Sequence, residues 1–256
     1  MRIALRSAAL AYLGALVLVP LGMILYRTFE NGLVAFWQQI TTPAAISALW
    51  LSLTIVAIVV PLNVVFGLIT ALALARGNFR GRGLLEAVVD LPFAVSPVIV
   101  GVALILFWGN EGWLAGTFPV IFSLPGMVLA TVFVTLPFVV REVEPVLREV
   151  GTEQEEAATT LGASKLQTFW RITLPAIRVG IAYGVVLTVA RALGEFGAVI
   201  VVAGGVAGES QTLTLLVHSR YIDDHNVFGA YSASTLLMAL ALVTLVLMTA
   251  LQRKRA

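Results

Sequence analysis

The sequence predicts an all-α integral membrane protein with six transmembrane helices, from its composition and from the length of its apolar stretches. Of its 256 residues, 59% are hydrophobic and only 12% are charged, about half the roughly 25% that is usual in soluble domains. Six stretches, taken as helices, are long enough to cross a hydrocarbon core of about 30 Å. They lie near residues 8–26, 47–74, 84–108, 119–140, 176–203 and 229–251. Runs of this length exclude a barrel of short alternating strands.

The first two stretches differ in what their length implies. The first follows Arg2 and Arg6, but its apolar part is too long for a signal peptide and no small-residue cleavage site precedes Tyr26. We therefore expect a retained anchor. The second, residues 47–74, would measure roughly 42 Å as a straight helix, so we expect it to tilt, to kink at Pro61 or to protrude from the bilayer.

The distribution of Lys and Arg predicts the orientation in the membrane, because these residues are retained on the cytoplasmic side. With both termini in the cytoplasm, all but three of the 16 Lys and Arg residues lie on that side. The exceptions are Arg27 and Arg220, which would lie outside, and Arg191, which would lie within the membrane. Topology thus accounts for the pI near 9.2, and a net charge of +2 gives no reason to expect a nucleic-acid partner.

The connection between the fourth and fifth stretches, residues 141–175, is too polar to enter lipid and is expected to form two short cytoplasmic helices. Thr152, followed three residues later by Glu155, predicts a capping box for the first helix. Gly162 would end this helix in a left-handed conformation. The helix carries two adjacent alanines, which allow close approach, among glutamates that keep it hydrated. We therefore expect it to be a docking surface.

The second short helix has its own start signal, Ser164 with Gln167 three residues later. We expect it to end at Leu174-Pro175, before the fifth stretch. One apolar face would lie against the membrane-side bundle, and its residues are Leu166, Phe169 and Trp170.

A spaced pattern in this connection resembles the signature loop of ABC importer membrane subunits. The pattern is Glu156-Ala157-Ala158, three residues, Gly162, nine residues, Ile172, one residue, and Leu174-Pro175. The resemblance implies the type I ABC importer permease fold, with a cytoplasmic coupling helix between spans four and five that sits in a cleft of an ATPase subunit. The ATPase-coupling residues would then be Glu156, Ala157, Ala158, Gly162, Leu174 and Pro175. The alternative is a generic amphipathic surface helix.

Three further segments are similar to the sulfate/thiosulfate permeases, above all to the CysW-type subunit, and the molybdate permeases share part of this likeness. They are Asp90-Leu91-Pro92-Phe93-Ala94-Val95-Ser96-Pro97, Leu136-Pro137-Phe138-Val139-Val140-Arg141-Glu142 and residues 190–199 (ARALGEFGAV). The resemblance implies a single transmembrane permease domain over residues 1–256, with a core permease bundle at 47–251 and an ATPase-docking loop at 141–175. It also implies a place in the bacterial cytoplasmic (inner) membrane.

The same resemblance implies the partners of the chain. The expected partners are a second homologous permease subunit, two ABC ATPase subunits that hold ATP and Mg, and an extracytoplasmic sulfate-binding protein. No cofactor is expected on this chain, and the transported solute would be a tetrahedral oxyanion such as sulfate or thiosulfate. Some relatives carry a longer polar tail where this sequence has residues 252–256, so the resemblance gives no expectation for contacts made by a tail.

Arg191 and Glu195 are two charges deep in the fifth stretch, where each would cost at least about 2.5 kcal/mol if it faced lipid. Their spacing of four residues puts them on one helical face. We favour a mutual ion pair over direct anion contact, because Glu195 would repel a dianion. The pair is expected to help set a gate or a subunit interface.

Ser96 and Pro97 form the second candidate for the substrate path. Together with Pro92 they interrupt the regular backbone bonding of the third stretch. Irregular backbone at membrane depth is tolerated beside protein or a water-filled cavity, and the uncharged Ser96 hydroxyl suits brief contact with an anion. An ordinary proline kink that only shapes packing is the alternative.

Several kinds of chemistry find no support in the sequence. There is no cysteine, which excludes thiol nucleophiles and thiolate metal sites. No Walker motif occurs, since Gly162-Ala163-Ser164-Lys165 lacks the first glycine and the final Ser or Thr, so ATP must be handled by a partner and the chain is not itself an enzyme. An ion-coupled secondary transporter of an inorganic anion is the alternative function, supported by the embedded charge pair. A non-transporting scaffold is disfavoured by the broken elements.

The outer loop, residues 204–226, carries histidines and aspartates that we interpret as solvated side chains and not as metal ligands. These residues are His218, Asp223, Asp224 and His225. Three glycines, at 204, 205 and 208, would make the loop mobile. Resemblance alone suggests that it meets the binding protein, and crosslinking from Ser210 would test that contact.

Overall fold

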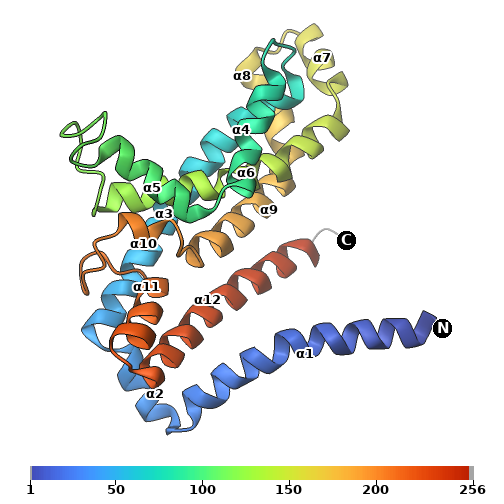
Figure 1. Ribbon diagram of the computed structural model, residues 1–256. Coiled ribbons are helices and arrows are strands. Elements are labelled where there is room, and N and C mark those ends of the chain that lie inside the picture. Colours follow the sequence, from blue (N-terminus) through green and yellow to red (C-terminus); the bar gives the residue numbers. More distant parts are fainter. Residues whose placement is uncertain (1, 254–256) are drawn as a thin grey trace.

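The structure, a computed structural model, describes residues 2–253, and all the regular elements in that range are helices (Figure 1). Within these residues, five helices are long and apolar enough to cross a membrane, and a bent pair brings the number to six. The five are α1 (Arg2–Phe29), α3 (Pro43–Arg76), α6 (Leu124–Val150), α9 (Leu174–Leu193, continuing from Lys165) and α12 (Val227–Arg253). The bent pair is α4 (Arg82–Ala94) with α5 (Pro97–Trp108). The predicted all-α membrane fold is therefore confirmed.

The remaining elements are short and lie towards the two ends of the bundle (Figure 1). At one end are α7 (Glu153–Thr160), α8 (Lys165–Thr168) and the π-helical turn η1 (Phe169–Thr173). Towards the other are α2 (Gly32–Ile40), α10 (Val199–Val202), α11 (Leu213–His218) and a second π-helical turn, η2 (Ser219–Asp223). Residues 254–256, which include two basic residues of the predicted cytoplasmic set, lie outside the described part of the chain.

Helices α3, α6 and α9 form the centre of the bundle because glycines let their backbones approach closely. A Cβ atom on Gly67 of α3 would lie 2.7 Å from the Cβ of Val139 on α6, and one on Gly184 of α9 would lie 2.8 Å from the Val139 Cα. One turn away, the buried Asn63 amide donates to the Thr135 hydroxyl at 2.5 Å. Small residues and interhelical hydrogen bonds are the usual means of holding helices together in lipid.

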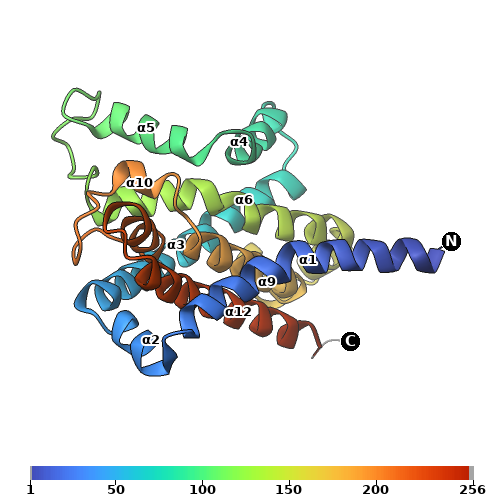
Figure 2. The ribbon, with the colours of Figure 1, turned by 60° about the horizontal axis from the view of Figure 1, so that its bottom comes forward.

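The other long helices flank this centre on opposite sides (Figure 2). The α4–α5 pair lies along one side of α6, whereas α1 and α12 lie on the other side of the bundle. The Thr28 and Thr235 hydroxyls share a buried 2.8 Å hydrogen bond that joins α1 to α12. Most side chains of α1 face outwards, as expected for a helix that borders lipid.

Three predicted spans differ from the observed helices. The fourth stretch, predicted over 119–140, is α6 (Leu124–Val150), so residues 141–150 of the predicted connection belong to this helix. The third stretch is not one kinked helix but two helices that meet at 111°. Pro97 has no backbone donor and disfavours helical geometry at the residue before it, so Ser96 is extended, with φ −60° and ψ 133°. The fifth stretch, predicted over 176–203, is wrong at its end, because α9 stops at Leu193 and Gly194 follows as its cap. The second stretch runs through Pro61 as one helix.

Candidate functional site

Helix α7 stands at one end of the molecule with no buried side chain (Figure 1). Glu156 and Ala157 are exposed, and Ala158 is partly so. Gly162 adopts a φ of +89°, the left-handed conformation expected of a residue that follows a helix end. A short exposed helix with small residues on its surface is available for docking against another protein.

Ionic and hydrogen bonds tie α7 to the bundle. The Glu155 carboxylate accepts hydrogen bonds from Arg76 of α3 at 3.2 Å and from the Thr173 hydroxyl of η1 at 2.9 Å. Arg76 also donates to the Gly151 carbonyl at 2.5 Å. The predicted capping box is therefore wrong, because Glu155 pairs with a guanidinium and the Thr152 hydroxyl donates to Glu156 instead.

The second short helix is confirmed at its start and differs at its end. Ser164 and Gln167 form the predicted capping box, with bonds of 3.3 and 2.9 Å. Leu174-Pro175 does not close the helix, because η1 leads directly into α9 with Pro175 in its first turn, where proline is tolerated. The predicted apolar face does not pack on the bundle, since Leu166 and Trp170 are largely exposed.

A pocket of about 410 Å³ lies at the bend between α4 and α5, and it brings together three residues that the sequence singled out. Ser96 and Pro97 line it from the bend, and Arg191 lines it from the last turn of α9. Phe138 of α6 forms part of the wall. The Ser96 hydroxyl makes no capping bond to α5. The N-terminal end of α5 and the Arg191 guanidinium therefore meet at one pocket.

Glu195 lies behind this pocket and forms the predicted ion pair with Arg191. Arg191 Nη1 and Glu195 Oε2 are 2.7 Å apart, and the Glu195 side chain is 1% exposed, whereas that of Arg191 is 33% exposed. The other carboxylate oxygen accepts a 2.8 Å bond from the Ala198 N–H. Glu195 thus holds the guanidinium at the pocket from the protein side.

Comparisons with known proteins place the chain in a family. A family model described as "Binding-protein-dependent transport system inner membrane component" matches residues 63–256. The chain belongs to this family of ABC importer permeases. As a member it is a transport subunit of an inner membrane, without an ATPase site of its own.

Curated relatives cover nearly the whole permease. A protein from Synechocystis sp., named "Sulfate transport system permease protein CysW", is 48% identical over 97% of this chain and 91% of its own length. The CysW protein of Escherichia coli (strain K12) is 46% identical over 93% of this chain and 83% of its own length. The CysT protein of the same organism is 34% identical over 97% of this chain and 91% of its own length.

A solved structure shares the fold of the permease. It is a bacterial ABC transporter involved in the import of the acidic polysaccharide alginate, and its matching chain has a TM-score of 0.80 at 20% sequence identity. The match covers 100% of this chain and 97% of that chain. The predicted ABC importer permease fold is therefore confirmed.

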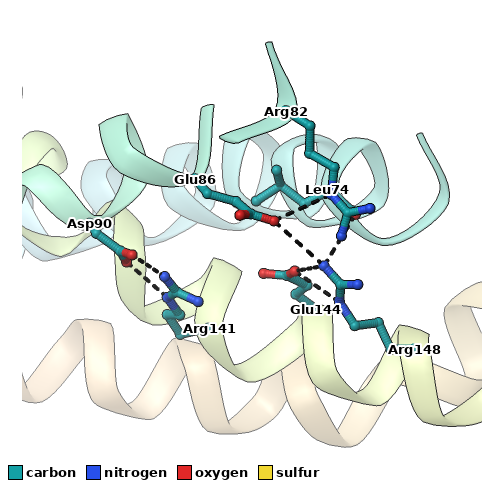
Figure 3. A network of polar contacts seen from close by, with 7 residues as sticks. All are labelled: Leu74, Arg82, Glu86, Asp90, Arg141, Glu144 and Arg148. Atoms are coloured by element: carbon teal, nitrogen blue, oxygen red, sulfur yellow. Dashed lines mark hydrogen bonds and ion pairs between the residues drawn. The ribbon is translucent and has the colours of Figure 1, made fainter. Parts of the chain in front are cut away.

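The sequence did not predict the ionic network between α4 and α6 (Figure 3). Arg141 Nε donates to Asp90 Oδ1 at 2.9 Å, and its Nη2 donates to the other carboxylate oxygen. Arg148 approaches Glu86 at 3.7 Å and donates to Glu144 and to the Leu74 carbonyl. One sequence signal could have indicated the Asp90–Arg141 pair, because each of these charged residues stands beside an apolar segment that contains a proline.

The outer segment is partly helical. It forms α11 and η2, and Ser210 is buried, with its hydroxyl accepting a 3.0 Å bond from the Val206 N–H. Ser210 is therefore unsuited to crosslinking. Buried Arg220 donates to the Thr42 hydroxyl at 2.8 Å and to the Gly229 carbonyl at 3.0 Å. Burial lowers the pKa of its guanidinium from the ordinary value.

Proposed function

We infer that this permease forms half of the membrane pathway of an ATP-driven importer for sulfate and thiosulfate. The observation that carries the proposal is 46–48% identity, over more than nine tenths of the chain, to permeases named for sulfate transport. The pocket at the α4–α5 bend agrees with it, since the uncharged Ser96 hydroxyl lines it and can donate to an anion, while Arg191 at its wall is paired with Glu195.

A second, homologous permease completes the pathway in this proposal. The chain resembles both CysW and CysT of one organism, at 46% and 34% identity. Two related permeases in one organism favour a heterodimer, in which this chain takes the CysW position. An extracytoplasmic binding protein would deliver the anion, by analogy with a structural neighbour, the bacterial alginate ABC transporter in complex with an alginate pentasaccharide-bound periplasmic protein.

Helix α7 would dock in an ATPase subunit of the importer and transmit its movements. The coupling residues are Glu156, Ala157, Ala158 and Gly162 on and after α7, with Leu174 and Pro175 at the start of α9. ATP and Mg belong to the ATPase subunits. The exposure of α7 and its ionic ties to α3 and η1 support this role, since a docking helix must move the bundle when it is moved.

In the membrane, α7 and both termini would face the cytoplasm. The basic residues of the α7 end, among them Arg76, Arg80 and Arg148, agree with the preference of positive charge for that side. The α2 and α11 end would face the binding protein.

Uptake of radioactive sulfate into proteoliposomes tests the proposal. We expect accumulation only when this permease is combined with a CysT-type permease, the ATPase subunits, the binding protein and ATP. Proteoliposomes that lack one component at a time are the controls. Uptake by this chain alone, driven by a proton or sodium gradient, would instead establish the ion-coupled secondary transporter.

A further inference from the structure

Helix α4 packs on the bundle through a narrow apolar strip, in which Val89 and Leu85 join a core cluster with residues of α3, α6 and α9. Of its 13 residues only Val89 is buried. Large apolar side chains on its outer face are exposed, among them Leu84 at 71% and Val88 at 53%. Because little apolar area fixes α4, polar contacts on its inner face have a large share in setting its position.

Two ion pairs and one aromatic contact form a stripe along this inner face. Glu86, Asp90 and Phe93 follow each other at spacings of four and three residues, which puts them on one face of α4. They meet α6 in reverse order, since the two helices are antiparallel. The three contacts are Glu86 with Arg148 at 3.7 Å, Asp90 with Arg141 at 2.9 Å, and the Phe93 ring edge-on to Phe138 with centroids 5.6 Å apart.

Of the two ion pairs between α4 and α6, Asp90–Arg141 lies nearer to the pocket. Its two parallel hydrogen bonds fix the direction of approach as well as the distance. Both side chains are close to half exposed, so water can replace either partner. Along α6, Arg141 lies one turn from Phe138, which lines the pocket together with Ser96 and Arg191.

The same network reaches towards α7. Arg148 contacts Glu86 of α4 and the Leu74 carbonyl of α3. Two residues beyond Leu74, Arg76 contacts Glu155 of α7. The last turn of α3 therefore touches both the docking helix and the arginine that holds α4.

We propose that Asp90 and Arg141 are positioning residues that latch α4 onto α6 and so fix the bend that forms the anion pocket. With the latch closed, Ser96 is held opposite Arg191; with it broken, α4 pivots and the pocket changes shape. A movement of α7 would reach α4, and with it the latch, through the end of α3, Arg148 and Glu86. The effect of the latch on sulfate transport rests on the proposed function, whereas its effect on the position of α4 does not.

The structural consequence is measured by electron paramagnetic resonance distances in the full chain in nanodiscs. The chain has no cysteine, so Val88→Cys on α4 and Ile69→Cys on α3, both exposed, accept spin labels selectively. We expect Asp90→Asn to broaden the distance distribution at least twofold, and the exchange Asp90→Arg with Arg141→Asp to narrow it again. An unchanged distribution in Asp90→Asn, or no recovery in the exchange, would overturn the latch.

The transport consequence is measured as sulfate imported per ATP hydrolysed in the reconstituted importer. We expect Asp90→Asn and Arg141→Gln to lower this ratio at least threefold, and the exchange to restore at least half of it. Arg27→Gln is the matched control, because it breaks an ion pair of 3.2 Å on α1, away from the pocket. If both single variants imported as much sulfate per ATP hydrolysed as the unaltered complex, the positioning role would be refuted. Absence of sulfate import by the unaltered complex would refute the proposed function instead, and the spin-label distances would still decide the latch.

Discussion

Arg191 and Glu195 form an ion pair whose two ends lie in different environments. The Glu195 carboxylate is almost completely enclosed, and the Arg191 guanidinium reaches the pocket at the α4–α5 bend, 2.7 Å from its partner. Glu195 also accepts the Ala198 N–H and so shapes the turn that follows α9. The buried Glu195 carboxylate therefore orients the Arg191 guanidinium and also stabilises the backbone turn that follows α9.

Arg191→Gln should destabilise the permease more than Glu195→Gln does. The first change leaves a buried carboxylate without its counter-charge, which typically costs roughly 3–5 kcal/mol. Because a third of the Arg191 side chain is exposed, water offsets part of this, and we expect about 2 kcal/mol. The glutamine of Glu195→Gln still accepts the Ala198 N–H. Thermal unfolding in detergent measures the difference, and a larger effect of Glu195→Gln would contradict this assignment.

Ser96→Ala should weaken sulfate transport without destabilising the bundle. The Ser96 hydroxyl is exposed at the pocket and makes no capping bond, and a hydrogen bond to a charged ligand contributes roughly 1.5–3 kcal/mol. We expect the KM of sulfate import to rise about tenfold. Ser47→Ala is the control, because the Ser47 hydroxyl bonds only within its own helix, to the Ala44 carbonyl. Normal import by Ser96→Ala would leave the bend a purely structural kink.

Gly162→Ala should impair coupling through backbone conformation alone. The φ of Gly162 is +89°, and a Cβ there would meet no atom within 4 Å, so the substitution introduces strain of roughly 1–2 kcal/mol and no clash. We expect ATP hydrolysis to continue while sulfate import falls severalfold. Gly208→Ala is a matched control with φ +90° and equal space at the other end of the molecule. Equal losses in both variants would indicate general strain, not a docking defect.

Gly67→Ala should destabilise the centre of the bundle. Its Cβ would lie 2.7 Å from the Val139 Cβ, so α3 and α6 must separate. Overpacking of this kind costs about 1–3 kcal/mol, and we expect a lower midpoint of thermal unfolding. Gly22→Ala on α1, where a Cβ meets nothing within 4 Å, should leave the midpoint unchanged or raise it. The reverse order would show that α3 and α6 are less closely packed than described.

Local features of the site could be predicted from the sequence because they depend on nearby residues. The Arg191–Glu195 pair follows from a spacing of four, and the left-handed Gly162 follows from its place after a helix. By contrast, Glu155 was assigned to a cap, since nothing local reveals Arg76, which lies 79 residues away in the chain.

The fold was predicted at the level of apolar stretches, and the differences lie where the chain bends. Composition does not distinguish a span from the broken segment after Leu193, because residues 199–203 are as apolar as α9 itself. The Asp90–Arg141 pair joins residues 51 positions apart, on two helices that no local pattern places side by side. Such contacts follow from the packing of whole helices.

In the proposed importer, α7 transmits the work of a separate ATPase to this permease. The most direct test is the amount of sulfate imported per ATP hydrolysed in proteoliposomes that contain the complete importer with Glu156→Lys. Glu153→Lys, an equal charge change on the same exposed helix, is the control. We expect Glu156→Lys to lower this ratio at least fivefold and Glu153→Lys to keep most of it. An unaltered ratio in Glu156→Lys would show that α7 does not couple the ATPase to this permease.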